Sequence, residues 1–182
     1  MTDADIIEET FPEVHEIADE ALRTKVVQIW LDAFEESAFE SLDEVPWWPP
    51  ADELVDHERQ VPHIRDVTAC AIAMVDTLQG RRPDLDVDRD LVVAGSLLHD
   101  ITKFYETDPE GVTELNSWLP HPHYSVHLLA KADCSLHLQH IVMAHTDNTN
   151  VSPRTLEAEL VRVADELAVS GMLWERAGEL EH

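Results

Sequence analysis

The sequence predicts an all-α fold, a single compact helical bundle with an N-terminal helical extension. Apolar residues recur three and four positions apart along most of the chain, which is the spacing of one helix face. Prolines, glycines and capping residues divide the chain into segments of helical length. The alternation of β-branched residues that marks strands is nearly absent. With 182 residues, the chain is long enough for one domain with a full core.

The N-terminal part is expected to contain one long helix. Because Pro12 suits the first turn of a helix, we predict a helix from Thr10 or Phe11 to about Phe39. The proline-rich run at residues 46–50, which includes two tryptophans, then interrupts the chain.

A short helix capped by Asp52 is expected after this interruption. We therefore predict that residues 1–58 form the extension and that residues 59–176 form the domain on which it packs.

Two helices are predicted in the centre of the chain. Pro62 begins the first, which ends near Gly80. Its apolar residues recur at helical spacing: Val67, Cys70, Ala71, Met74 and Leu78. Asp86 or Asp88 can cap the second helix, which runs through Leu98.

The C-terminal half predicts one short helix and three further helices. Residues 104–119 are expected to form a loop with one short helix. Pro122 begins a helix that runs toward Lys131, and another covers about residues 135–144. The last long helix is expected over about residues 152–176.

The charge of the chain is strongly negative. Asp and Glu number 38 against 12 Lys and Arg, which gives a formal net charge of −26. Such a chain repels itself at ordinary salt, but the Debye length falls to about 3 Å at molar salt. A halophile's cytoplasm is therefore the environment that we expect. The charge argues against binding to nucleic acid polymers, and it would repel a phosphate ester unless bound cations reversed the local field.

Cysteine usage and hydropathy narrow the protein class further. The two cysteines, Cys70 and Cys134, predict no disulfide framework and are expected to fill the core. No apolar run reaches the length of a membrane span, and the N-terminus does not resemble a signal peptide. We therefore expect a cytoplasmic protein with no membrane partner.

The most informative motif is His99-Asp100, which closes the apolar run 91–98. A buried aspartate requires a partner or a metal, because burying an unpaired charge is costly. Adjacent residues on a helix diverge by about 100°, so both side chains can reach one metal only near a helix end. The alternative is a surface pair with no function.

Asp165 is an independent indication of the same chemistry. Its neighbours at helical spacing are apolar: Val161, Ala168, Val169 and Met172. A carboxylate on such a face requires compensation, either from a metal or from an ion pair with Arg162.

Several histidines are available to complete a metal site. His63 shares a helix face with apolar residues and is expected to point inward, although a lone inward histidine is more often a hydrogen-bonded core residue. His121 and His145 lie at predicted helix ends, where each alone could be exposed to solvent. Imidazole and carboxylate donors together suit Fe, Mn, Co, Ni or Zn.

The order of these residues resembles the HD superfamily of metal-dependent phosphohydrolases, whose signature is a histidine, an adjacent His-Asp pair and a distal aspartate. The resemblance runs from about residue 57 to 170. Three runs carry it: His63-Ile64-Arg65-Asp66-Val67, Leu97-Leu98-His99-Asp100-Ile101-Thr102-Lys103 and Val163-Ala164-Asp165-Glu166-Leu167-Ala168. The central run is similar to the family's common Leu-Leu-His-Asp-Ile-Gly-Lys, with Thr102 in place of glycine.

The resemblance extends to family members that hold two metals. The run His121-Pro122-His123-Tyr124-Ser125 is similar to their His-Pro-x-x-Gly segment, and Ala144-His145-Thr146 is similar to their later histidine. The resemblance therefore implies an HD-type bundle with one ion on His63, His99, Asp100 and Asp165 and a second ion on Asp100, His121 and His145. We expect two divalent transition metal ions, with Fe or Mn favoured and Co, Ni, Zn or Mg as alternatives.

The expected activity is hydrolysis of a nucleotide or another small phosphate ester, with a dinucleoside polyphosphate among the candidates. Metals acidify a bound water and shield phosphate charge. The expected catalytic residues are His99, Asp100, Lys103 and Asp66. Lys103 would contact a phosphate oxygen, unless it is a solvated surface lysine. Asp66 would orient His63 or assist proton transfer. The alternative function is a non-catalytic HD module that binds metal or nucleotide for sensing or structure. A homodimer through the extension is a further expectation.

Other residues near the motifs have weaker cases. Arg65 and Arg162 are candidates for contact with the metal ligands. Trp47 and Trp48 are expected to pack the extension against the domain, with stacking on a base as the alternative, and Trp118 is a candidate pocket wall. Five other histidines are alternative ligands: His57, His123, His127, His137 and His140. His15 and His182 are expected on the surface.

Overall fold

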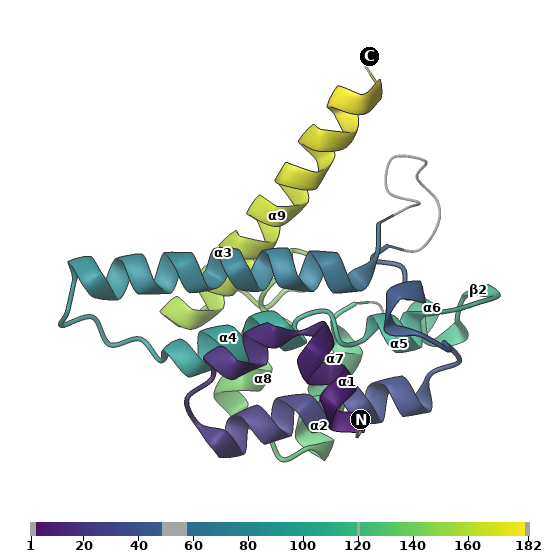
Figure 1. Ribbon diagram of the computed structural model, residues 1–182, viewed down its shortest axis with the longest axis horizontal. Helices are drawn as coiled ribbons and strands as arrows, with labels where there is room; N and C mark the ends of the chain where they lie inside the picture. The colour runs from purple at the N-terminus through teal and green to yellow at the C-terminus, as the bar shows by residue number, and fades with distance from the viewer. Residues whose placement is uncertain (1–2, 49–57, 120, 181–182) are drawn as a thin grey trace.

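The body of the protein is built from four helices whose apolar faces meet. A computed structural model describes residues 3–48, 58–119 and 121–180. Helix α3 (Gln60–Arg81) packs against α4 (Arg89–Leu98) and α9 (Leu156–Leu180), and α4 also contacts α8 (Leu136–Met143). Figure 1 shows α9 crossing α3 and extending beyond the other helices at its C-terminal end. The all-α prediction is confirmed.

The N-terminal segment is divided where one helix was predicted, so that prediction is wrong. It forms α1 (Asp3–Thr10), a 3₁₀ turn η1 (Pro12–Glu16), α2 (Glu20–Glu36) and a second turn η2 (Leu42–Glu44). The carboxylate of Asp90 on α4 accepts hydrogen bonds from the backbone N–H groups of Ala18 and Asp19, at 3.0 and 2.7 Å. Asp19 in turn caps α2. These hydrogen bonds from a helix distant in sequence therefore stabilise the interruption between η1 and α2.

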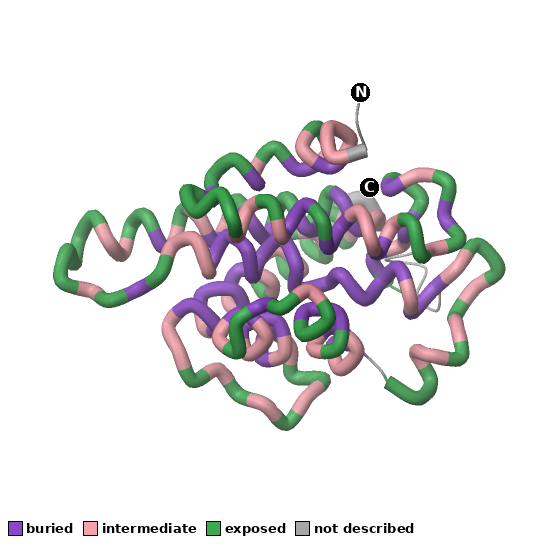
Figure 2. Tube along the Cα trace, turned by 90° about the horizontal axis from the view of Figure 1, so that it is seen from below, coloured by how far each residue is buried: buried purple, intermediate pink, exposed green. Residues whose placement is uncertain are grey.

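The N-terminal helices share their core with the motif-bearing helix α4. Trp30 on α2 is fully buried, and its indole N–H donates to the carbonyl of Leu97 at 3.0 Å. Its ring lies 4.4 Å from that of Phe11 and 5.6 Å from that of Phe104, measured between centroids. Figure 2 shows buried residues gathered in the interior of the molecule and exposed residues on its outer turns.

The segment after α4 is more structured than the loop with one short helix that the sequence predicted. It contains α5 (Lys103–Glu106), a two-stranded antiparallel hairpin of β1 (Thr107–Asp108) and β2 (Gly111–Val112), and α6 (Glu114–Trp118). Gly111 has a φ of 136°, a backbone conformation that favours glycine. The carboxylate of Asp108 accepts from the N–H groups of Glu110 and Gly111, which closes the hairpin.

The remaining helices lie close to their predicted positions. Helix α4 ends at Leu98 and is capped by Asp88, α7 spans His123–Lys131, and α8 is capped by Ser135. Helix α9 begins at Leu156, a few residues later than predicted. The expected cap Asp52 lies outside the described residues. In the described part of the chain, no helix has the length and apolar character needed to cross a membrane.

Candidate metal centre

The His99-Asp100 pair lies at the end of α4, inside the protein. His99 follows the last residue of the helix and is fully buried, while Asp100 is 3% exposed. The side chain of Gln60, at the start of α3, donates to the backbone carbonyl of Asp100 at 2.7 Å. The apolar run before the pair predicted that this carboxylate and imidazole would be buried side by side, as they are.

Three helices bring a first group of ligand atoms together. His63 Nε2 on α3 lies 3.2 Å from His99 Nε2 and 3.2 Å from Asp165 Oδ1 on α9. His99 Nε2 lies 3.9 Å from the same Asp165 oxygen. His63, His99 and Asp165 therefore present atoms at spacings suited to one metal ion. Arg162 pairs with Glu159 and Glu166 instead of Asp165, so the ion-pair alternative for Asp165 is excluded.

A second group forms on the other side of Asp100. His121 Nε2 lies 2.9 Å from His145 Nε2, and the two nitrogens lie 2.8 and 3.8 Å from Asp100 Oδ1. The other oxygen, Oδ2, faces the first group, at 3.7 Å from His63 Nε2 and 3.8 Å from His99 Nε2. Each oxygen of Asp100 therefore faces a different pair of histidines.

Hydrogen bonds to the outer ring nitrogens set the tautomers of these histidines. His99 Nδ1 lies 2.7 Å from the carbonyl oxygen of Ser96, and His145 Nδ1 lies 2.6 Å from that of Val142. A carbonyl oxygen only accepts hydrogen bonds, so both Nδ1 atoms carry the proton. Their Nε2 lone pairs consequently point into the cluster, which is the orientation a metal ligand requires.

Burial favours the neutral form of two of the imidazoles, whereas the pKa of a third is raised: burial and Lys103 would lower the pKa of His121, but Asp100 and Glu106 outweigh them. Burial lowers the pKa of His99, and burial together with His121 and His99 lowers the pKa of His145 to about 3. Burial alone would raise the pKa of Asp100, but Lys103, His121 and His99 outweigh it and hold that pKa well below its usual range. The pKa of Asp165 is lowered for a similar reason, by His63 and His99 against the effect of burial.

These residues fit divalent cations. His99 and His145 each hold an unprotonated Nε2 against another imidazole nitrogen, at 3.2 Å from His63 and 2.9 Å from His121. Two buried lone pairs this close repel each other unless a proton or a cation lies between them. Neutral imidazoles and ionised carboxylates are also the forms that bind metals.

The sequence reasoning missed Glu106, which is 1% exposed and contacts the site directly. Its Oε1 lies 3.1 Å from His121 Nδ1, and its Oε2 accepts from Lys103 Nζ at 3.2 Å. Burial alone would raise its pKa, but His121 and Lys103 lower it to about 2. Helical spacing from Thr102 and Lys103 was the signal that could have identified it.

A pocket of about 390 Å³ opens onto the cluster. Its charged end is formed by Asp100, Lys103, His121, His145 and Asp165. Its other walls come from Trp47, Trp48, Thr146, Asn148, Val169 and Leu173. Lys103 is 2% exposed and its Nζ lies 5.3 Å from the ring centroid of Trp48, so it is not the solvated surface lysine that was the alternative.

Backbone pairing positions the two tryptophans at the pocket. Trp47 N–H donates to the carbonyl of Glu58 at 3.2 Å, which joins the segment after η2 to the start of α3. The Trp47 ring then packs on that of His63, with centroids 4.9 Å apart. Trp118, also considered as a pocket wall, is 75% exposed and lies outside the lining, so that expectation is wrong.

Other predicted residues lie away from the cluster. Asp66 is exposed on α3, and among the described residues it makes no contact with His63, so the role predicted for it is not supported by the geometry. Arg65 pairs with Glu13.

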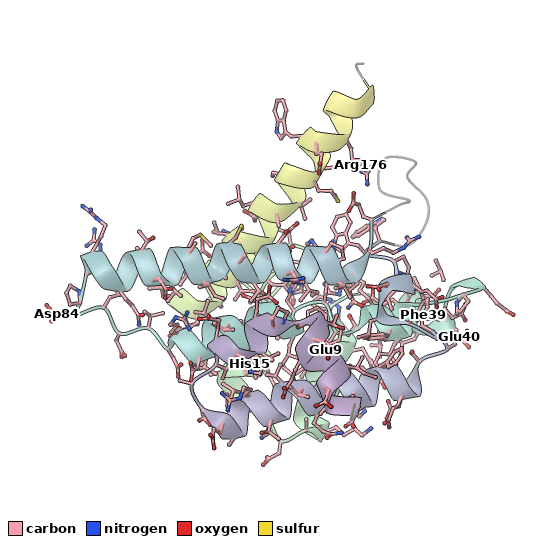
Figure 3. All side chains as sticks on the ribbon, viewed as in Figure 1. Glu9, His15, Phe39, Glu40, Asp84 and Arg176 are labelled. Carbon is pink, nitrogen blue, oxygen red and sulfur yellow. The ribbon has the colours of Figure 1, made fainter. Side chains whose placement is uncertain are left out.

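Among the described residues, the alternative histidines do not join the site. His137 contacts Thr155 and Glu157, and His140 accepts from the N–H of Arg154. His127 is exposed on α7 and, like His123, does not line the pocket. His15 is exposed on η1 (Figure 3), as expected. His57 and His182 lie outside the described residues.

Comparison with known proteins assigns the family. The family model for the HD domain matches residues 62–170, which include all six predicted metal ligands. The chain therefore belongs to the HD domain family, whose members bind divalent metals.

A curated relative gives a more particular likeness. The chain is 33% identical over 111 residues to dihydroneopterin 2',3'-cyclic phosphate phosphodiesterase of Methanocaldococcus jannaschii. The match covers 58% of this chain and 44% of that relative, so the chain spans less than half the length of the curated protein that it matches. No solved structure matches the chain.

Proposed function

We propose that this protein is a metal-dependent phosphohydrolase that cleaves a small phosphate ester, with two divalent ions in its active site. The observation that carries the proposal is the position of Asp100, whose two carboxylate oxygens face two separate histidine pairs. Membership of the HD domain family and the likeness to a phosphodiesterase support a hydrolase of phosphoester bonds.

Six side chains would hold the two ions. His63, His99 and Asp165 would bind the first with Asp100 Oδ2, and His121 and His145 would bind the second with Asp100 Oδ1. When bound, divalent ions lower the pKa of a coordinated water and neutralise phosphate charge. The donor set of imidazole and carboxylate favours Fe or Mn, with Co, Ni, Zn or Mg as alternatives.

Lys103 supplies the positive charge that belongs to the chain itself. Among the described residues that line the pocket, it is the only lysine or arginine. Its ammonium lies 3.2 Å from Glu106 Oε2 and 4.0 Å from Asp100 Oδ1, beside the metal ligands. We assign to it the binding of a phosphate oxygen, which a chain of net charge −26 would otherwise repel.

The pocket walls favour a substrate with a flat ring next to its phosphate. Trp48 is 41% exposed at the pocket, and Val169 and Leu173 contribute apolar surface from α9. A ring can stack on an exposed indole, while Asn148 and Thr146 offer polar groups to its edge. A nucleotide and a pterin phosphate both have this chemistry. The relative's activity on a cyclic phosphate leads us to place cyclic phosphodiesters first among the candidates.

Turnover and metal content together test the proposal. Purified protein with Mn²⁺ or Fe²⁺ at molar KCl should hydrolyse at least one member of a panel of cyclic phosphates, nucleotides and dinucleoside polyphosphates. His99→Ala and Asp100→Ala should lose both metal and activity. His121→Ala should lose one of two metal equivalents, whereas His127→Ala, an exposed histidine on α7, should keep both.

Each negative result has a distinct meaning. Full metal occupancy without turnover of any phosphate ester would refute the enzyme and favour a non-catalytic module. A single equivalent that His121→Ala does not change would refute the two-ion site.

A further inference from the structure

Behind His121 lies a buried hydrogen-bonded group, made of Thr102, Glu106 and Lys103, that the metal ligands alone do not explain. Thr102 is fully buried, and its hydroxyl donates to Glu106 Oε1 at 2.5 Å. The same carboxylate oxygen lies 3.1 Å from His121 Nδ1, and the hydroxyl oxygen of Thr102 lies 3.0 Å from that nitrogen. The other oxygen, Oε2, accepts from Lys103 Nζ at 3.2 Å.

The direction of these hydrogen bonds follows from the chemistry of the groups. An ionised carboxylate only accepts, so Thr102, His121 Nδ1 and Lys103 are all donors to Glu106. His121 therefore carries a proton on Nδ1, and its Nε2 faces Asp100 Oδ1 and His145 Nε2, on the side where the second ion would bind. Backbone carbonyls hold the Nδ1 protons of His99 and His145. A side chain holds that of His121, and a side chain can be changed.

Thr102 is a departure of this chain from the motif that it resembles. The related run has glycine at this position, which has no hydroxyl to offer. Thr102 has a φ of −72°, so its backbone does not require glycine. The threonine therefore adds a donor to Glu106 without straining the turn after Asp100.

We propose that Glu106, supported by Thr102, is a positioning residue that orients His121 for the second metal ion and holds the Lys103 ammonium at the pocket wall. This inference rests on the two-ion site of the proposed function. Because hydrogen-bond partners of metal-bound histidines fix the ring and its tautomer, their loss ordinarily weakens metal affinity by about 10–100-fold.

Matched variants test the role of each group. Glu106→Gln keeps the shape but removes the negative charge. Thr102→Val removes the hydroxyl at nearly constant volume, whereas Thr102→Ser retains it. Glu157→Gln is the control, since Glu157 is also a buried carboxylate, at 6% exposure, but it accepts from the N–H of Asp88, away from the pocket.

The readout is metal binding, which does not depend on turnover. Mn²⁺ and Co²⁺ are titrated into the metal-free protein, with equivalents measured by elemental analysis and the Co²⁺ ligand geometry followed by visible absorption. We expect Glu106→Gln and Thr102→Val to bind the second ion about 10–100-fold more weakly and to change its Co²⁺ spectrum, while the first ion is unaffected. Thr102→Ser and Glu157→Gln should resemble the wild type.

Two results would overturn the inference. In one, Glu106→Gln and Thr102→Val bind both ions as tightly as the wild type. In the other, the variants lose both ions together with their folded structure by circular dichroism, which would make Glu106 a structural residue only. Failure of the proposed hydrolysis is a separate result, since it would appear as intact metal binding without turnover.

Discussion

Replacing Gly95 by alanine should destabilise this protein, although alanine is the better helix former. Gly95 is buried on α4, where that helix meets α8 and α9. A Cβ atom at this position would lie 2.5 Å from Cγ2 of Ile141 and 3.5 Å from Cγ2 of Val161. Real side chains do not approach this closely, and the branched side chain of Ile141 has little rotamer freedom in a helix. The helices must therefore move apart.

The size of the effect follows from two opposing contributions. Alanine in place of a helical glycine stabilises by roughly 0.5–1 kcal/mol, whereas overpacking a dense core costs about 1–3 kcal/mol. We expect a net loss of about 1–2 kcal/mol in the free energy of unfolding. Because α4 leads into His99 and α9 carries Asp165, the same displacement should weaken metal binding.

Urea unfolding at constant high salt, with and without metal, measures both effects. Gly171→Ala is the control, because a Cβ at that position on α9 meets no atom within 4 Å. This control should be more stable than the wild type by roughly 0.5–1 kcal/mol. If Gly95→Ala is as stable as the wild type or more so, the close approach of α4 to α8 does not constrain the core and the reasoning is wrong.

Three further predictions concern pH, substrate and salt. Burial alone would raise the pKa of Glu157, but the hydrogen bond from the N–H of Asp88 holds that pKa below the ordinary 4.5. The ionised carboxylate therefore stabilises the fold fully above pH 4.5, and this stabilisation is lost as the pH falls through the lowered pKa. Glu157→Gln should therefore lower the melting temperature at neutral pH and have less effect in acid, and an equal effect at both would contradict this assignment. Trp48→Leu should raise KM for substrates with a flat ring much more than for a small aliphatic phosphodiester, as measured by steady-state kinetics on both. An equal change in the two KM values would exclude stacking. The melting temperature should rise steeply between dilute buffer and molar KCl, because salt screens a net charge of −26, and a flat salt profile would argue against the predicted halophilic origin.

Four of the six predicted metal ligands have a local signature in the sequence. His99-Asp100 follows an apolar run, Asp165 lies on an apolar helix face, and His63 shares a face with core residues. Family resemblance then added His121 and His145, which have weaker local signals. The structure brings all six to one cluster, while the assignment of two ions remains a proposal.

Other parts of the chain could not be predicted because their structure depends on distant contacts. The break between η1 and α2 is held by Asp90 from α4, more than seventy positions along the chain. Trp47 reaches the pocket through backbone pairing with Glu58. The role predicted for Asp66 is not supported by the geometry, because this residue lies on an exposed face of α3.

The sequence by itself determined the all-α class and the main helices, since helix periodicity and caps are local properties. It also predicted six candidate metal ligands, of which His121 and His145 came from the family resemblance. Only the tertiary structure decided which oxygen of Asp100 faces each group of predicted ligands. It also placed Glu106 behind His121 and Lys103 inside the pocket. The physical reason is that a hydrogen bond or a shared cation depends on distances of a few ångströms between helices, and their packing sets those distances.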